Sequence, residues 1–241
     1  MSVWPWSLPE EWRARQARRA LPASVRERLR HVRLGFLDRP GLGQPLALAR
    51  FVALDLETTG PRMLEDCIIS IGAVAVSERM VRHDDAYEAL LRQDRSSAVD
   101  NILIHQIGGQ EQLAGMDPAE ALVGCLEFIG DSRVVAFRAE FDATVFEREV
   151  RRQLGYRAWP RFIDLAALLP AIFPGTENDT LDDWVAHFEL PPIGRHHAIA
   201  DAYATAQLLM IVLEAAPRSG IETAADLRDA EQAQRWLGRR R

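Results

Sequence analysis

The chain has 241 residues, of which 48% are hydrophobic and 27% are charged, enough for one main domain with an appendage to fold around its own core. Its two cysteines lie inside apolar runs, which favours buried, reduced thiols over a disulfide or a zinc site. The arginine-rich N-terminus contains no continuous apolar stretch. We therefore expect neither a secretory signal nor a membrane span, and by default a cytoplasmic location.

Positive charge is concentrated at the N-terminus. Residues 1–50 contain ten arginines and four acids, a net charge of +6, whereas the rest of the chain contains 19 arginines and 31 acids, a net charge of −12. This asymmetry predicts a basic arm on an acidic body, and the acidic body argues against tight duplex binding that ignores sequence. We divide the chain into a basic helical extension at 1–49, a main domain at 50–216, and a C-terminal helix and tail at 217–241.

Apolar periodicity, together with the residues that begin and end helices and strands, predicts the elements in chain order. We expect helices at 9–20 and 22–36, a turn at 40–43, strands at 51–56, 68–76 and 80–91, a helix at 118–129, a short buried strand at 134–137, and helices at 142–154, 164–172, 180–188, 198–215 and 222–237. Thr180 and Asp183 form a capping-box-like start for one of these helices. This order of elements predicts an α/β fold in which helices flank a mixed β-sheet.

An acidic motif, Asp-Leu-Glu-Thr-Thr-Gly, directly follows an apolar strand. Residues two apart on a strand point to the same face, so Asp55 and Glu57 project together. Two like charges held that close are costly unless a cation neutralises them, and hard oxygen ligands favour magnesium or manganese. A solvated pair of acids on an edge strand would give the same pattern. Thr58 and Thr59 would present hydroxyls to whatever the metals bind, although a plain turn needs the same Gly60.

Two further motifs are weak evidence alone and become informative in combination with the first. Asp142 follows the predicted strand at 134–137, but it could equally cap the next helix, because aspartate is a preferred N-cap residue. His196 and Asp201 open an alanine-rich helix and lie five residues apart, so a histidine ahead of the helix and an acid in its first turns can converge on one site. A histidine here could also be an ordinary surface or capping residue.

Together these motifs resemble those of the DEDDh 3′→5′ exonuclease family, which includes the epsilon proofreading subunit of bacterial DNA polymerase III and related RNA-trimming exonucleases. The resemblance covers residues 50–213, and the matching residues are Asp55, Glu57, Asp142, His196 and Asp201. The segment at 104–107, Ile-His-Gln-Ile, resembles the family's segment near the terminal nucleotide of the substrate. The segment at 162–165, Phe-Ile-Asp-Leu, resembles its strand-to-helix step.

The resemblance implies an RNase H-like exonuclease domain over 50–216 that hydrolyses phosphodiester bonds. It implies two Mg²⁺ ions, which Mn²⁺ can replace, and their ligands would be Asp55, Glu57, Asp142 and Asp201. Two such ions stabilise the attacking and leaving oxygens of an in-line phosphoryl displacement. His196 would remove the proton of the attacking water, a task that suits histidine. The substrate-binding residues would be Thr58, Thr59, His105 and Arg138, and the products nucleoside 5′-monophosphates released from the 3′ end.

Two departures from the family pattern bear on substrate preference. Phe137 and Arg138 stand where many relatives have His-Asn, and Gln106 replaces the usual glycine after His105. None of these positions is a metal ligand in the family. The Arg138 guanidinium could add a phosphate contact, because guanidinium pairs well with phosphate oxygens, or it could point to solvent.

Several functional alternatives stay open at this point. We expect a single-stranded 3′ end as substrate, with DNA favoured over RNA, and a polymerase or repair complex as a candidate partner. An RNA-trimming exonuclease of the same family is the alternative enzyme, and a catalytically silent RNase H-like binding module is the alternative outside the enzymes. Trp4, Trp6 and Trp12 in the basic arm could stack on bases or insert into a partner. We favour the simpler arrangement, two amphipathic helices packed on the catalytic domain.

Overall fold

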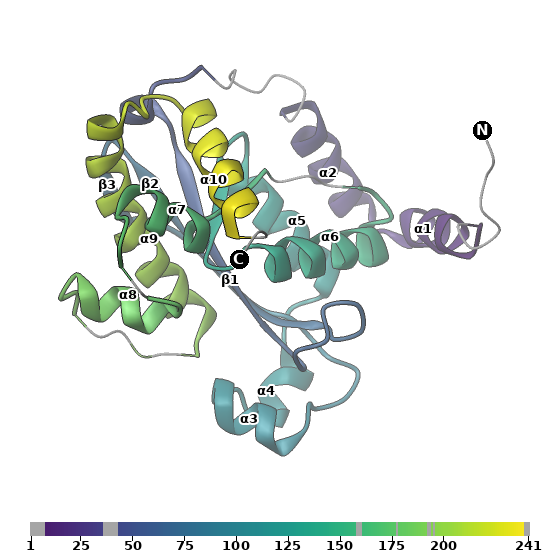
Figure 1. Ribbon diagram of the computed structural model, residues 1–241. Helices are drawn as coiled ribbons and strands as arrows, with labels where there is room; N and C mark the ends of the chain where they lie inside the picture. Colours follow the sequence, from purple (N-terminus) through teal and green to yellow (C-terminus); the bar gives the residue numbers. More distant parts are fainter. Residues whose placement is uncertain are drawn as a thin grey trace.

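The computed structural model describes residues 8–35, 43–157, 161–176, 178–191, 194 and 196–238. Its centre is a five-stranded mixed sheet with the strand order β3-β2-β1-β4-β5 (Figure 1). The strands are β1 (Phe51–Thr58), β2 (Ile68–Ser77), β3 (Met80–Leu90), β4 (Arg133–Ala136) and β5 (Phe162–Asp164). The first three form an antiparallel meander, and β4 and β5 add parallel to β1. The predicted α/β fold is confirmed.

Ten α-helices lie within the described residues. They are α1 (Leu8–Ala20), α2 (Ala23–Gly35), α3 (Val99–His105), α4 (Gly109–Ala114), α5 (Pro118–Ile129), α6 (Glu140–Leu154), α7 (Leu165–Ile172), α8 (Leu181–His187), α9 (Ala198–Ala215) and α10 (Ala224–Gly238). Short 3-10 turns lie at Leu46–Leu48 and Ala216–Ser219. The predicted helices are present, and Thr180 and Asp183 form the expected capping box. Helices α3 and α4 and strand β5 were not among the elements predicted from periodicity, and most of the predicted turn at 40–43 lies outside the described residues.

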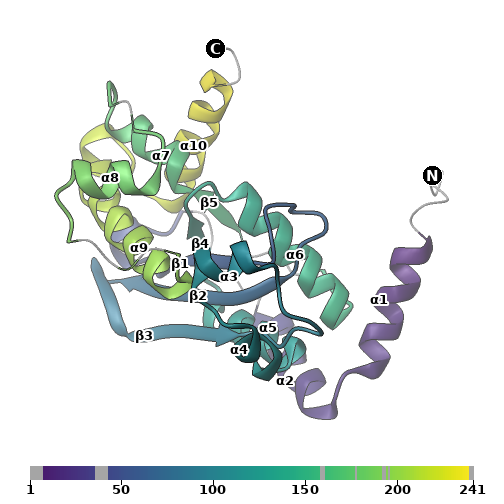
Figure 2. The ribbon, with the colours of Figure 1, turned by 90° about the horizontal axis from the view of Figure 1, so that it is seen from below.

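Helices cover both faces of the sheet (Figures 1 and 2). Alternation along β1 explains how: Val52, Leu54 and Leu56 enter a core shared with α2, α5 and α6, whereas Phe51 and Ala53 enter a second core shared with α7, α8, α9 and α10. Continuing the alternation puts the next odd-numbered side chains on the α9 face, at the carboxyl end of β1. The two acids of the first motif occupy those positions.

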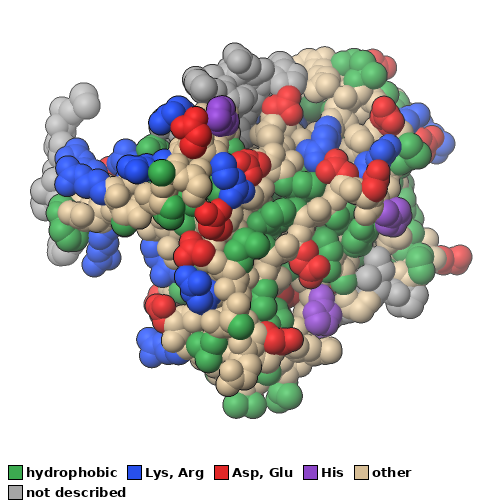
Figure 3. Space-filling view, turned by 180° about the vertical axis from the view of Figure 1, so that it is seen from behind, with side chains coloured by type: hydrophobic (Ala, Val, Ile, Leu, Met, Phe, Trp, Pro, Cys, Tyr) green, Lys and Arg blue, Asp and Glu red, His purple; other side chains and the backbone are tan. Residues whose placement is uncertain are grey.

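The N-terminal extension packs on the main domain. Val25 and Leu29 of α2, with Leu21 just ahead of this helix, are buried in the core on the α5 side of the sheet. Arg28 pairs with two glutamates of α5, at 2.5 and 2.6 Å. Helix α1 lies against α6, and Figure 3 shows its arginines on the outer surface. The packed-helix interpretation of the arm is therefore supported for α1 and α2; Trp12 is 61% exposed, and Trp4 and Trp6 lie outside the described residues.

One described helical segment, Ala198–Ser219, has the length and hydropathy of a membrane span, and 56% of its most apolar window is buried within the fold. Helix α9, which makes up most of this segment, packs on β1 and β2. A helix that is apolar on most of its circumference is expected where the sheet and other helices surround it. The hydropathy of α9 therefore agrees with its place in the core.

Candidate active site

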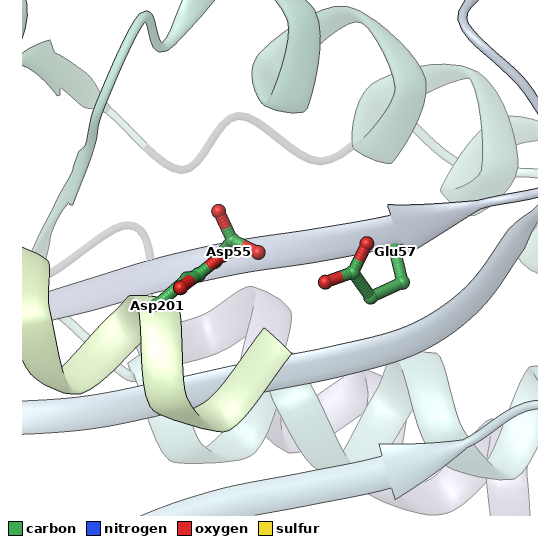
Figure 4. Close-up of side chains that lie close together, drawn as sticks. All are labelled: Asp55, Glu57 and Asp201. Atoms are coloured by element: carbon green, nitrogen blue, oxygen red, sulfur yellow. The ribbon is translucent and has the colours of Figure 1, made fainter. Parts of the chain in front are cut away.

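Three carboxylates converge at the carboxyl end of β1. Asp55 and Glu57 project from the strand, Asp201 projects from the first turns of α9, and one oxygen of each lies within 4.8 Å of the others. Figure 4 shows the three side chains directed toward one another. Glu57 and Asp201 are buried, with 5% and 7% exposure. Carboxylates this close and this buried need a counter-charge, and their oxygens are the ligands that a hard divalent cation prefers.

Asp142 lies beside this group on another element. It occupies the first turn of α6, whose N-cap is Ala139, so the alternative that Asp142 caps this helix does not apply. The pKa of Asp142 is raised to about 8, mainly by burial and also by the charges of Glu57 and Asp164, and backbone hydrogen bonds from Asp142 itself and Leu56 oppose this rise. Asp142 is thus an acid that stays protonated at neutral pH unless a cation favours its charged form. The oxygens that lie within 4.8 Å of one another come from Asp55, Glu57 and Asp201, and Asp142 is outside that group, so its role as a ligand stays a prediction.

The histidine of the third motif stands at the entrance to α9. The backbone N–H of His196 donates to an Asp201 oxygen at 3.3 Å, and His196 has a positive φ of 64°. The side chain of His196 is exposed, and it lies outside the group of atoms within 4.8 Å that the three carboxylates form. His197 is the N-cap residue of α9. The backbone contact links the proposed base to a proposed ligand and leaves the imidazole free to face a substrate.

Helix α3 closes the other side of the site. Its His105 places Nδ1 directly against the Glu57 carboxylate. One turn earlier, the buried Asn101 donates from its side-chain amide to the carbonyl of Thr58 at 2.8 Å. Sequence reasoning did not find Asn101. Its i, i+4 spacing from His105 on one helix face was the available signal.

The loop after β1 is held by its own hydrogen bonds. The Thr58 hydroxyl donates to the Gly60 carbonyl at 2.7 Å, and the Thr59 hydroxyl donates to Asp66 at 3.2 Å. Arg148 of α6 donates to the carbonyls of Met63 and Asp66 and so ties the loop to the helix that carries Asp142. Both threonine hydroxyls are therefore used within the loop itself, and their role in substrate binding stays a prediction.

Arg138 lies at the carboxyl end of β4. Its backbone has a positive φ of 58°, and its N–H donates to Asp164 at 3.0 Å. The exposed guanidinium donates to the carbonyl of Asp179 at 3.0 Å. Asp164 also pairs with Arg235 of α10, at 3.1 Å. This network joins the C-terminal helix to the edge of the sheet that carries the site, and a phosphate contact by Arg138 stays a prediction.

Comparison with known proteins decides the family. The profile of the RNase T exonucleases matches residues 52–209, which include the four acids and the histidine. The chain belongs to this exonuclease family. Its motifs are those of the DEDDh exonucleases, and the resemblance expected from them is confirmed.

Relatives among bacterial DNA polymerases share this domain. The chain is 28% identical over 179 residues to the PolC-type DNA polymerase III of Caldanaerobacter subterraneus subsp. tengcongensis, and the match covers 73% of the chain and 12% of that protein. The PolC-type enzyme of Thermotoga maritima is 30% identical, and the match covers 74% of this chain and 13% of that protein. The epsilon subunit of DNA polymerase III from Aquifex aeolicus is 26% identical, with 68% and 80% covered. The chain thus spans about an eighth of the PolC-type proteins and corresponds to one domain of them.

Solved structures show the same fold. E. coli exonuclease I in complex with a dA16 oligonucleotide superposes with a TM-score of 0.61 at 19% identity, covering 70% of this chain and 42% of that one. Exonuclease X in complex with 5′ overhanging duplex DNA gives a TM-score of 0.57 at 24% identity, and the match covers 76% of this chain and 99% of that one. The sheet and its helices are therefore RNase H-like, as the motifs implied.

Proposed function

We propose that this protein is a metal-dependent 3′→5′ exonuclease that removes nucleotides from a single-stranded 3′ end, with DNA favoured over RNA. The observation that carries the proposal is the convergence of Asp55, Glu57 and Asp201 within 4.8 Å, with Asp142 beside them. Such a group has no evident structural use, since it gathers like charges where burial makes them costly. It suits a site that holds divalent cations against a phosphodiester.

The residues of the chain then take separate roles. Asp55, Glu57, Asp142 and Asp201 would hold two Mg²⁺ ions, for which Mn²⁺ can substitute. When bound, such ions stabilise charge on the attacking and leaving oxygens of an in-line displacement. His196 takes the proton of the attacking water, because it is exposed beside Asp201 and histidine accepts a proton near neutral pH.

Substrate binding falls to the two elements that enclose the carboxylates. Thr58 and Thr59 would place the backbone at the end of β1 beside the terminal nucleotide, and His105 would approach from α3. Arg138 adds a guanidinium that can exchange its contact with a carbonyl for a phosphate. The products are nucleoside 5′-monophosphates. The relatives named as bacterial polymerase subunits support a cytoplasmic enzyme with a polymerase or repair complex as partner.

Digestion of matched substrates tests this function. Linear single-stranded DNA, the same strand closed into a circle, duplex DNA, duplex DNA with a mismatched 3′ end and RNA would each be incubated with the full chain and Mg²⁺ or Mn²⁺. We expect mononucleotides from linear single strands and from the mismatched end, and none from the circle. Cleavage of the circle would overturn the end requirement. Faster digestion of RNA would favour the RNA-trimming alternative, and no metal-dependent release from any substrate would favour the silent binding module.

A further inference from the structure

An arginine cluster lies at the amino ends of the parallel strands, opposite the end of the sheet that carries the carboxylates. Arg133 is the first residue of β4, and Arg161 immediately precedes β5. These strands run parallel, and the N–H of Val134 donates to the Arg161 carbonyl at 3.1 Å, so the two arginines lie side by side at the amino ends of the strands. The acids of the proposed active site stand at the carboxyl end of β1, at the far end.

Helix α10 brings a third arginine, Arg228, to the same place. The helix is positioned by Arg235 near its C-terminal end, which contacts Asp164, the last residue of β5. Arg228 lies seven residues earlier, about 10 Å back along the helix, which places it toward the start of β5, where Arg161 lies. Burial, together with the positive charges of Arg161 and Arg228, lowers the pKa of Arg133. Arg161 and Arg228 are therefore both close enough to Arg133 for their charges to act on it.

These positive charges are poorly compensated. In the part of the chain that the structure describes, Asp229 is the one carboxylate in contact with the cluster, 3.2 Å from Arg228 and 66% exposed. The Nε atom of Arg228 is buried and has no hydrogen-bond partner. Like charges with a single exposed counter-charge are costly to hold together, and a bound anion would relieve that cost. Planar guanidinium groups match the oxygens of phosphate in particular.

We propose that Arg133, Arg161 and Arg228 form a phosphate-binding site, separate from the carboxylate site, for the backbone of a nucleic-acid strand. The choice of a strand as the ligand rests on the proposed function; the anion site itself does not, and free phosphate presents the same chemistry. Arg133 is the cross-strand partner of Phe51, and Asp55 and Glu57 lie further along β1, about 13 and 20 Å from that level. At about 3.4 Å per stacked nucleotide, a strand held at both sites needs about six nucleotides or more.

Oligonucleotide length separates this site from the catalytic one. Binding of single strands of about 4 and about 20 nucleotides would be measured with full-length Asp55→Asn protein, so that no strand is degraded. Adding Arg161→Gln should weaken binding of the long strand several-fold and make the slope of log K against log salt less negative by about 0.7 for each phosphate that the protein no longer neutralises. Binding of the short strand should not change. The control is Arg30→Gln, which removes an exposed charge on α2, away from the cluster.

Binding of inorganic phosphate tests the site without nucleic acid. At constant ionic strength, phosphate should raise the Tm of the parent protein but not that of Arg161→Gln. Without phosphate, the Tm of Arg161→Gln should be no lower than that of the parent, because the substitution removes like-charge repulsion. If Arg161 had a purely structural role, the substitution would lower the Tm. Loss of phosphate protection with unchanged long-strand binding would assign the site to free phosphate and refute the strand as its ligand. If neither strand length nor phosphate distinguishes Arg161→Gln from the parent, the site does not exist, whether or not the protein cleaves nucleic acid.

Discussion

Asp55 on β1 is the cross-strand partner of Gly72 on β2, and the first turn of α9 rests on that glycine. A Cβ atom at Gly72 would lie 2.2 Å from the carbonyl carbon of Ala198, a distance that real Cβ atoms do not show. The missing side chain lets the backbone of α9 approach the sheet beside Asp55. This contact brings Asp201, three residues further along the helix, to the carboxylates of β1.

Gly72→Ala should therefore disturb the site without touching any proposed ligand. We expect a loss of stability of about 1–3 kcal/mol, because the added methyl group meets rigid backbone. We expect a fall in kcat of about 10²-fold, the effect of misplacing a reacting group by about 1 Å. Thermal unfolding and turnover at saturating substrate measure the two effects. Gly43→Ala is the matched control, since nothing lies within 4 Å of its Cβ position; equal behaviour of the two variants would contradict the close-approach role.

Asp55→Asn should abolish hydrolysis and preserve the fold. The amide keeps the size of the side chain but removes a charge that cations require, and several kcal/mol of transition-state stabilisation correspond to about 10³-fold or more in rate. Without metal, Asp55→Asn should be at least as stable as the parent, because one of three crowded like charges is gone. The measurements are Mg²⁺-dependent release of mononucleotides and the Tm with and without Mg²⁺. Asp84→Asn, on the exposed edge strand, is the control, and near-parental activity of Asp55→Asn would refute the metal assignment.

The stability of the metal-free protein should fall as pH rises from about 4 to about 8. The pKa of Asp142 is raised to about 8 by burial, so the folded protein keeps a proton that the unfolded chain releases near its ordinary pKa of about 4. Between those values folding takes up a proton, and raising the pH disfavours it. Mg²⁺ should weaken this decline, because a cation favours the charged carboxylate.

Urea unfolding in EDTA at about pH 5 and about pH 8.5, repeated with Mg²⁺, tests this expectation. Asp142→Asn removes the titrating group and should lose the corresponding part of the decline, whereas Asp84→Asn should keep it. An identical pH dependence in the parent and in Asp142→Asn would show that Asp142 does not hold the proton.

Local patterns predicted the elements that carry the site. Side-chain alternation along one strand sufficed to place Asp55 and Glu57 on one face, and alanine-rich helical spacing placed Asp201 in the first turns of α9. Helix α5 was predicted with its observed bounds from the helical spacing of its apolar residues. In the structure, Asp117 caps its start and Gly130 follows its end.

Tertiary contacts determine the parts of the fold and of the site that the sequence did not predict. Helix α3 escaped prediction because its large apolar residues Val99 and Leu103 are about 70% exposed, so no buried periodic face marks it. Asn101 reaches Thr58 across 43 residues of sequence. Gly72 matters because α9 returns to it from far along the chain, and no pattern within one strand indicates such a contact.

The N-terminal helices should contribute to stability and not to chemistry. Leu29 of α2 is 3% exposed within the core on the α5 side, so Leu29→Ala should cost about 2–5 kcal/mol of unfolding free energy. The kcat of the folded fraction should stay unchanged, because the proposed ligands and base lie on other elements than α2. Leu48→Ala, at a residue that is 73% exposed, is the control and should be nearly neutral. A large kcat loss in folded Leu29→Ala protein would mean that the arm helps to build the site.

The adjacent histidines at the start of α9 should differ sharply in their contribution to the rate. His196 has its backbone N–H on Asp201 and a left-handed conformation that no ordinary helix start requires, whereas His197 adopts the extended conformation of an N-cap residue. Their side chains therefore leave the chain in different directions, and one imidazole alone can serve the attacking water. Loss of a general base typically costs about 10²–10⁴-fold in rate, while loss of a peripheral substrate contact appears mainly in KM. We expect the large kcat defect in His196→Ala, with the acidic limb of the pH–rate profile disappearing, and a small defect in His197→Ala. The opposite ranking, measured on folded proteins at saturating Mg²⁺, would move the role of base to His197.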